Sequence, residues 1–162
     1  MCYNKNISLE RSVYLIRRAR KTDKEEIDKL YKDWNENYGH DDLTSCFFDR
    51  FDQGFYEDII CCEESGRIVS AAVVCDAQEY NFPDKFSNSK ALLFLGTHSK
   101  FEKKGYASKL LSFILNSSLN RNGIVVDVAQ TDHYNFYKRF GFFKVNTEGD
   151  DNDIIFVEPN AK

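Results

Sequence analysis

The sequence predicts an α/β fold, a mixed sheet with helices on both faces, over a single domain of residues 1–162. Short runs of β-favouring residues alternate with segments whose apolar residues recur every three or four positions. Two runs, 91–97 and 124–129, are almost continuously apolar, which is typical of strands that are covered on both faces.

The first half of the chain predicts one strand, two helices and a hairpin. Residues 13–17 favour a strand, and Thr22 and Glu25 have the spacing of a capping box. The helix behind them carries one apolar stripe, formed by Ile27, Leu30, Tyr31 and Trp34. A second helix is expected to start at Asp41 or Asp42. Two strands, 55–62 and 67–76, are expected around a turn at 63–66.

The second half predicts three strands after a polar loop, with two helices between them. The run 91–97 is followed by a helix that starts after Gly105 and ends at Asn122–Gly123. Its inward residues are expected to be Ala107, Leu110, Leu111 and Ile114. After the strand 124–129, a short helix capped by Thr131 or Asp132 is expected to stop at Gly141. Residues 142–145 and 154–157 predict a closing hairpin.

Composition excludes several classes of protein. The net charge of −4 and a pI near 5.4 argue against general binding to nucleic acid or to an anionic membrane. No apolar run approaches about 18 residues, and the first residues lack the apolar core of a signal peptide. The five cysteines are an odd number without the spacing of metal ligands, so we expect reduced thiols, a cytoplasmic protein and no metal.

A basic turn separates the run 91–97 from the helix after Gly105. Four lysines and one acid lie between His98 and Lys109, in a chain that is acidic overall. Backbone N–H groups at the start of a helix bind anions, and small residues such as Gly105 and Ala107 let a ligand come close. The pattern therefore predicts a site for a phosphate-bearing cofactor. The alternative is that the lysines are solvated loop charges.

Two segments resemble the GNAT superfamily of acyl-CoA-dependent N-acetyltransferases. Glu102-Lys-Lys-Gly-Tyr-Ala107 follows one apolar run and is similar to the family's Gln/Arg-x-x-Gly-x-Gly/Ala loop. Asn135-Phe-Tyr-Lys-Arg-Phe-Gly-Phe142 follows the next and resembles its Phe-Tyr-x-x-x-Gly-Phe signature. The two segments lie about thirty residues apart, and the resemblance extends from Tyr14 to Val157.

The resemblance implies a mostly antiparallel sheet whose two central strands splay apart around acetyl-CoA, the cosubstrate. Loop N–H groups would hold the diphosphate, the strand end 95–97 would pair with the pantetheine arm, and Tyr137 would protonate the CoA thiolate. The implied cofactor-binding residues are Leu95, Gly96, Thr97, Glu102, Lys103, Lys104, Gly105, Tyr106, Ala107, Ser108, Asn135 and Tyr137. The alternative for Tyr137 is a tyrosine at the edge of the core that packs on the sheet.

Two positions depart from the family pattern. Glu102 places a carboxylate where Gln or Arg is usual, which costs roughly 1 kcal/mol beside a phosphate unless the side chain turns away. The run 91–97 contains no acid or histidine to act as the base that several members carry there. His98, at its end, is the first candidate for the general base. Weaker candidates are Glu64, Asp76, Glu79 and Asp127, and a mechanism without a base also stays open.

The acceptor is expected to be a primary amine of a small molecule or peptide. Eight acids and one Arg lie between Asp33 and Asp58, together with several aromatic residues, and this mixture favours a cationic amine. Substrate contacts are expected from Trp34, Tyr38 and Phe47; alternatively, these aromatics belong to the core and the acids form a solvated helix face. A non-catalytic acyl-CoA-binding module with the same fold is the alternative function, and edge strands make a homodimer an open expectation.

Overall fold

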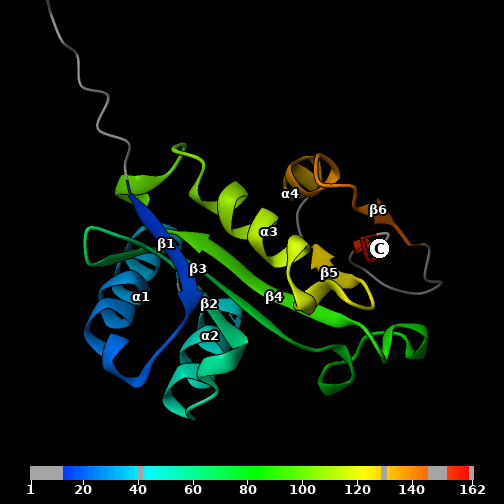
Figure 1. Ribbon diagram of the computed structural model, residues 1–162, viewed down its shortest axis with the longest axis horizontal. Helices are drawn as coiled ribbons and strands as arrows, with labels where there is room; N and C mark the ends of the chain where they lie inside the picture. The colour runs from blue at the N-terminus through cyan, green and yellow to red at the C-terminus, as the bar shows by residue number, and fades with distance from the viewer. Residues whose placement is uncertain (1–12, 40–41, 129–130, 146–152, 161–162) are drawn as a thin grey trace, which may run out of the picture.

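One twisted sheet organises the molecule (Figure 1). The computed structural model describes residues 13–39, 42–128, 131–145 and 153–160. The strands of this part of the chain are β1 Tyr14–Arg18, β2 Ile59–Glu64, β3 Arg67–Asp76, β4 Lys90–Thr97, β5 Ile124–Val128, β6 Phe143–Lys144 and β7 Asp153–Val157. Their order across the sheet is β1-β2-β3-β4-β5-β7-β6. Every neighbouring pair is antiparallel except β4 and β5, which are parallel.

Helices cover both faces of the sheet, which confirms the predicted fold class (Figure 1). The helices α1 (Lys24–Tyr38) and α2 (Asp42–Asp52) pack on one face, and α3 (Tyr106–Asn116) and α4 (Thr131–Lys138) on the other. The first face buries Ile27, Leu30, Trp34, Phe47 and Phe51 against Ile59, Ala71 and Val73. The second buries Leu110, Leu111 and Ile114 against Ala72, Val74 and Leu92. Odd-numbered and even-numbered residues of β3 therefore pack against helices on opposite faces of the sheet, because successive side chains of a strand point to opposite faces.

The β2–β3 hairpin forms as the sequence predicts. Ser65 and Gly66 both have positive φ, 51° and 76°, which defines the type I′ turn that fits the twist of antiparallel strands. The preceding strand begins at Ile59, later than expected, because Tyr56–Asp58 form a 3₁₀ turn.

The ends of two helices differ from expectation. The helix α1 begins at Lys24, not behind a Thr22–Glu25 capping box, because the Asp23 carboxylate accepts the Arg20 N–H at 2.7 Å and shapes a 3₁₀ turn. The helix α3 ends at Asn116, well before Gly123. Ser117 stops it by donating its hydroxyl to the Ile114 carbonyl at 2.7 Å, an example of a side chain that competes with the helix.

Three cysteines of the described chain, Cys61, Cys62 and Cys75, are free and buried. Burial raises the pKa of the Cys61 thiol to about 12 and that of Cys62 to about 11. A thiol with so high a pKa is a poor nucleophile at neutral pH. Of the helices described, none is long and apolar enough to cross a membrane.

Candidate active site

The two parallel strands in the middle of the sheet separate soon after they start. Within the described residues, β4 and β5 pair at Lys90–Ile124 and Ala91–Val125 and not beyond. On its other side β4 stays paired with β3 as far as Thr97. One edge of β4 from Leu92 onward therefore faces a gap between strands.

Backbone polar groups of β4 point into this gap. The His98 N–H donates to the Val69 carbonyl of the β3 side at 2.8 Å. Because backbone direction alternates along a strand, Thr97 and Leu95 present their N–H and C=O groups to the opposite edge. The Thr97 carbonyl already accepts the Trp34 indole N–H at 3.1 Å, so Leu95 offers the freest pairing position.

The loop between β4 and α3 leaves several N–H groups free. No hydrogen bond to another described residue uses the N–H of Lys103, Lys104, Gly105, Ala107 or Ser108. Gly105, the residue before α3, has a φ of +83°, and a Cβ built there would meet open space within 4 Å. Free donors beside open space at a helix N-terminus suit a diphosphate. The Tyr106 ring, in contrast, is buried, so any contact from it would come from its backbone.

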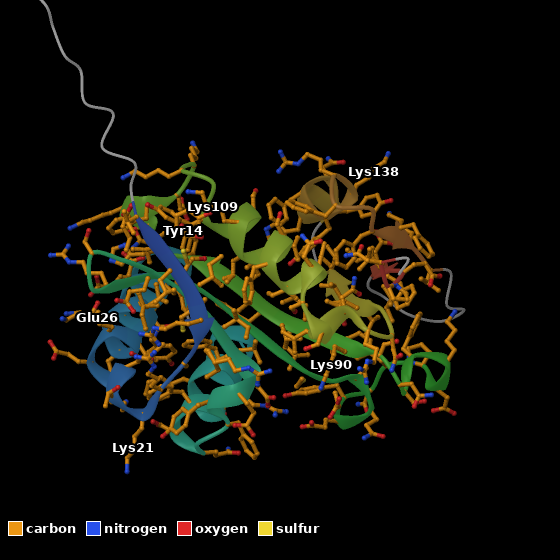
Figure 2. The ribbon with its side chains drawn as sticks, viewed as in Figure 1. Tyr14, Lys21, Glu26, Lys90, Lys109 and Lys138 are labelled. Carbon is orange, nitrogen blue, oxygen red and sulfur yellow. The ribbon has the colours of Figure 1, made fainter. Side chains whose placement is uncertain are left out.

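Lysines surround this helix start. Lys109 lies in the first turn of α3, with its Nζ 4.2 Å from the ring centre of Tyr14 and 4.8 Å from that of Tyr106 (Figure 2). Lys104 lies over Phe101 at 5.0 Å, while Lys103 has a positive φ of 59° in the exposed loop. Cations at a helix N-terminus oppose the helix dipole unless an anion binds there.

Glu102 turns away from the free N–H groups. Its carboxylate accepts a hydrogen bond from the Tyr38 hydroxyl at the end of α1. The departure from the family pattern at this position is therefore accommodated, because the carboxylate is held on the α1 side of the loop.

Tyr137 lies in α4, packed against the apolar cluster that contains Leu92 of β4 and Val126 of β5. Its ring meets that of Phe142 edge to face at 5.3 Å. Burial raises the pKa of its hydroxyl, so this group stays protonated through the neutral range. Burial is the one cause of this shift, and no hydrogen bond or charge of another described residue contributes to it. Asn135, in the same helix, is exposed.

His98 lies at the loop end of β4, in contact with α1. Its Nδ1 accepts the Lys100 N–H at 3.2 Å and lies 3.3 Å from Asp33 Oδ1. Along a strand that rises about 3.3 Å per residue, His98 is roughly 20 Å from Leu92, where the gap begins.

The other candidate bases are spread across the sheet. Asp76 pairs with Lys90 at 2.6 Å and Glu79 with Arg50 at 2.6 Å. Asp127 is exposed on β5, two residues after the last pair with β4. Because Val126 and Val128 pack in the α3 layer, alternation places the Asp127 side chain on the α1–α2 face of the gap.

The three predicted substrate contacts lie in different surroundings. Trp34 and Phe47 are 2% and 0% exposed, and they pack edge to face at 5.3 Å in the core beneath α1 and α2. A Cβ on Gly96 would meet Trp34 and Phe94 within 3.0 Å, so this glycine makes room for the packed rings. Tyr38 is exposed but bonds to Glu102. Within the described residues, Trp34 and Phe47 therefore belong to the core, and none of the three lines the pocket described next.

A pocket of about 550 Å³ lies on the α2 side, and sequence reasoning did not single it out. It is lined by Ser45, Asp49, Arg50, Gln53, Phe55, Glu79 and Tyr80. Arg50 pairs with Asp58 at 2.5 Å and Glu79 at 2.6 Å and lies over the Phe55 ring at 5.1 Å. Within the predicted acidic and aromatic surface, Asp58 and Phe55 therefore already have Arg50 as a partner in the protein. In the sequence, Arg50 is the one arginine among eight acids between Asp33 and Asp58. This excess of acids was the signal that could have indicated its pairing with carboxylates.

A protein-family model matches most of the chain. Residues 18–145 match the model of the acetyltransferase (GNAT) domain. No curated protein sequence matches the chain.

Solved structures share the fold at low sequence identity. A GNAT-family acetyltransferase from Bacillus cereus superposes with a TM-score of 0.67 at 17% identity, covering 92% of this chain and 99% of the other. The yncA protein of Salmonella typhimurium, solved with its cofactor acetyl-CoA, gives 0.65 at 18%, covering 93% and 96%. Diaminobutyrate acetyltransferase from Paenibacillus lautus, solved with L-2,4-diaminobutyric acid and coenzyme A, gives 0.61 at 14%, covering 91% and 96%.

Proposed function

Because this chain belongs to the GNAT family of acetyltransferases, we propose that it moves an acetyl group from acetyl-CoA to a primary amine of a small molecule or peptide. One observation carries the proposal. The free edge of β4 leads directly to a loop and helix start where the N–H groups of Lys103, Lys104, Gly105, Ala107 and Ser108 bond to no other described residue, so an arm and a diphosphate have adjoining places to bind. The yncA structure with acetyl-CoA supports the choice of cosubstrate.

The residues fit this cosubstrate in two ways. Leu95 offers its N–H and C=O to the amide groups of a pantetheine arm, as an added strand would. The loop from Lys103 to Ser108 offers N–H groups to the diphosphate, and the lysines add a favourable field. This arrangement directs the thioester toward the closed end of the gap, near Leu92 and Tyr137.

The chemistry needs no covalent bond to the protein. The acceptor nitrogen attacks the thioester carbonyl, a C–N bond forms, and the C–S bond breaks. Tyr137 gives its proton to the departing sulfur, and the nitrogen loses a proton to a base or to water. Holding both reactants in place contributes about 7–11 kcal/mol to lowering the barrier.

The acceptor is proposed to approach from the α1–α2 face. Asp127 lies on that face beside the gap, and we place it as the carboxylate that attracts the amine and receives its proton. His98, the first candidate from the sequence, becomes the second in this proposal, because its place at the loop end is far from the proposed position of the thioester. The pocket around Arg50 lies on the same side as α2. Its Glu79 is paired with Arg50, and Asp49, the other lining carboxylate, favours an amine that carries positive charge.

A thiol-release screen tests the proposal. The full chain is incubated with acetyl-CoA and with primary amines of several kinds: polyamines, amino sugars, amino acids and peptides. Matched tertiary amines serve as controls, because they cannot form a neutral amide. We expect CoA release above hydrolysis with at least one primary amine, and an N-acetyl product by mass spectrometry. CoA binding without release across the panel would support the non-catalytic module, and no CoA binding would reject both.

A further inference from the structure

Three side chains of α1 hold the segment that leads from β4 into the loop. Asp33 bonds to Ser99, the Trp34 indole N–H donates to the Thr97 carbonyl at 3.1 Å, and the Tyr38 hydroxyl bonds to Glu102. We call these three residues the α1 clamp. They come from the last turns of one helix, more than sixty residues away from the loop in the sequence.

Asp33 makes the most extensive of these contacts. One carboxylate oxygen accepts the Ser99 N–H at 2.7 Å, and the other accepts the Ser99 hydroxyl at 2.6 Å. The second oxygen also lies 3.3 Å from His98 Nδ1. The side chain is 11% exposed, so water competes little with these bonds.

Ser99 is well placed to control the loop. It opens the 3₁₀ turn Ser99–Phe101, whose N-cap is His98. The Phe101 N–H donates to the His98 carbonyl at 2.8 Å, and the free N–H groups start only two residues further on, at Lys103. The hydrogen bonds from Ser99 to Asp33 therefore set the direction in which the chain enters the loop.

We propose that Asp33 is a positioning residue for the diphosphate of the cosubstrate. It does not touch the ligand; it fixes Ser99 so that the N–H groups of 103–108 converge on one point before binding. Preorganised donors bind an anion better than donors that must be ordered at the moment of binding. The inference rests on the proposed use of acetyl-CoA.

Two variants at this position separate hydrogen bonding from charge. Asp33→Ala removes both acceptors, while Asp33→Asn keeps the shape: its oxygen accepts the Ser99 N–H, and its NH₂ donates to the Ser99 hydroxyl. We expect the Kd for CoA, measured by titration calorimetry, to rise roughly tenfold in the Ala variant and to stay near the wild-type value in the Asn variant. Asp28→Ala is the matched control, since Asp28 is an exposed α1 carboxylate paired with Lys24.

A second donor distinguishes positioning from general damage to the fold. S-Acetylpantetheine carries the same thioester and arm but no diphosphate. In Asp33→Ala, kcat/KM for acetyl-CoA should fall by roughly tenfold, while kcat/KM for S-acetylpantetheine stays unchanged. An equal loss for both donors would overturn the proposal, because a distorted fold does not discriminate between them.

Two further outcomes distinguish a failure of this inference from a failure of the proposed function. Unchanged CoA affinity in a folded Asp33→Ala protein would overturn the inference while leaving the proposed function intact, whereas a wild-type protein that binds no CoA would remove the proposed function itself. If Asp33→Ala does not fold, Ser99→Ala replaces it, since that change removes only the hydroxyl contact. A Kd raised about threefold would then support positioning, and a wild-type Kd would reject it.

Discussion

At the scale of single residues, Tyr137 carries the clearest chemical expectation. Burial keeps the pKa of its hydroxyl above the ordinary value. A protonated hydroxyl beside the closed end of the gap suits a group that donates a proton late, when charge has developed on sulfur.

Replacing this tyrosine separates chemistry from binding. We predict that Tyr137→Phe lowers kcat about 100-fold and leaves the Kd for CoA close to the wild-type value, because the hydroxyl acts only on the leaving thiolate. Steady-state kinetics and calorimetry check the two halves. Tyr134→Phe in the same helix is the control and should retain full turnover, since Phe keeps the ring that Lys144 contacts. Equal turnover in both variants would remove Tyr137 from the mechanism.

Residue-level reasoning from sequence succeeded where chemistry lies in one contiguous segment. The loop around Gly105 could be predicted, because glycine, small residues and lysines follow one another at a helix start. Asp33 could not be predicted, because its partner Ser99 is brought to it only by the packing of α1 on the sheet. Trp34 shows the opposite case. It belonged to the same apolar stripe as Ile27 and Leu30, so the periodicity already indicated a core residue.

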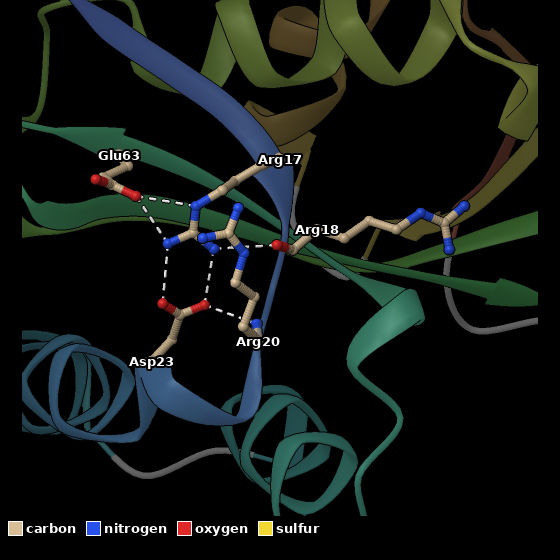
Figure 3. A network of polar contacts seen from close by, with 5 residues as sticks. All are labelled: Arg17, Arg18, Arg20, Asp23 and Glu63. Atoms are coloured by element: carbon tan, nitrogen blue, oxygen red, sulfur yellow. Dashed lines mark hydrogen bonds and ion pairs between the residues drawn. The ribbon is translucent and has the colours of Figure 1, made fainter.

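At the scale of elements, one ionic network joins β1, β2 and the start of α1 (Figure 3). The Arg17 guanidinium bonds to both oxygens of Asp23, at 2.8 and 2.9 Å, and to Glu63 at 2.7 Å. Burial alone would raise the pKa of Asp23, but the Arg17 guanidinium and the Arg20 N–H outweigh it, so the pKa lies below its ordinary value. Since β1 is an edge strand, this network fixes it to its neighbour.

Breaking the network should cost stability in a pH-dependent way. We predict that Asp23→Asn lowers the free energy of unfolding by about 2–3 kcal/mol at neutral pH, because one of the two carboxylates that pair with the partly buried Arg17 loses its charge. A lowered carboxyl pKa contributes stability above the unfolded value, about 3.9, and loses it as pH falls through the folded value. The difference between wild type and variant should therefore shrink below about pH 4 in urea unfolding experiments.

An exposed ion pair on the same helix provides the comparison. Lys24 and Asp28 pair at 2.5 Å, with both side chains nearly half exposed. Asp28→Asn should leave the unfolding midpoint unchanged, since solvent screens such pairs. A loss in Asp28→Asn equal to that in Asp23→Asn would show that the Asp23 network contributes no more than an exposed ion pair.

The boundaries of elements were harder to predict than their order. Strand patterns depend on side chains along the whole strand, so all the main strands appeared in sequence. The start of α1 and the end of α3 depend on single polar side chains, Asp23 and Ser117, which bond to nearby backbone in competition with the helix. Such local competition leaves no periodic signal.

At the scale of the whole molecule, the sheet consists of two parts that share little backbone pairing. The strands β1–β4 form one part, and β5, β7 and β6 form the other (Figure 1). In the described structure two residue pairs join them, and the other contacts include one apolar cluster beneath α3 and α4 and a second one that contains Ala91 of β4 and Val125 of β5. A ligand in the gap would replace missing strand contacts and connect the parts.

This arrangement predicts which parts of the protein coenzyme binding should stabilise. We expect CoA at 100 times its Kd to stabilise the protein by about 2.7 kcal/mol in thermal unfolding, and ATP, which lacks the pantetheine arm, to stabilise it much less. Hydrogen exchange should slow at Leu95 and at the loop 103–108 together, because one ligand occupies both places. Protection of the loop without Leu95 would mean that the diphosphate binds but the arm does not lie along β4. Since the thioester is attached to that arm, the same result would leave Tyr137 without a substrate to protonate.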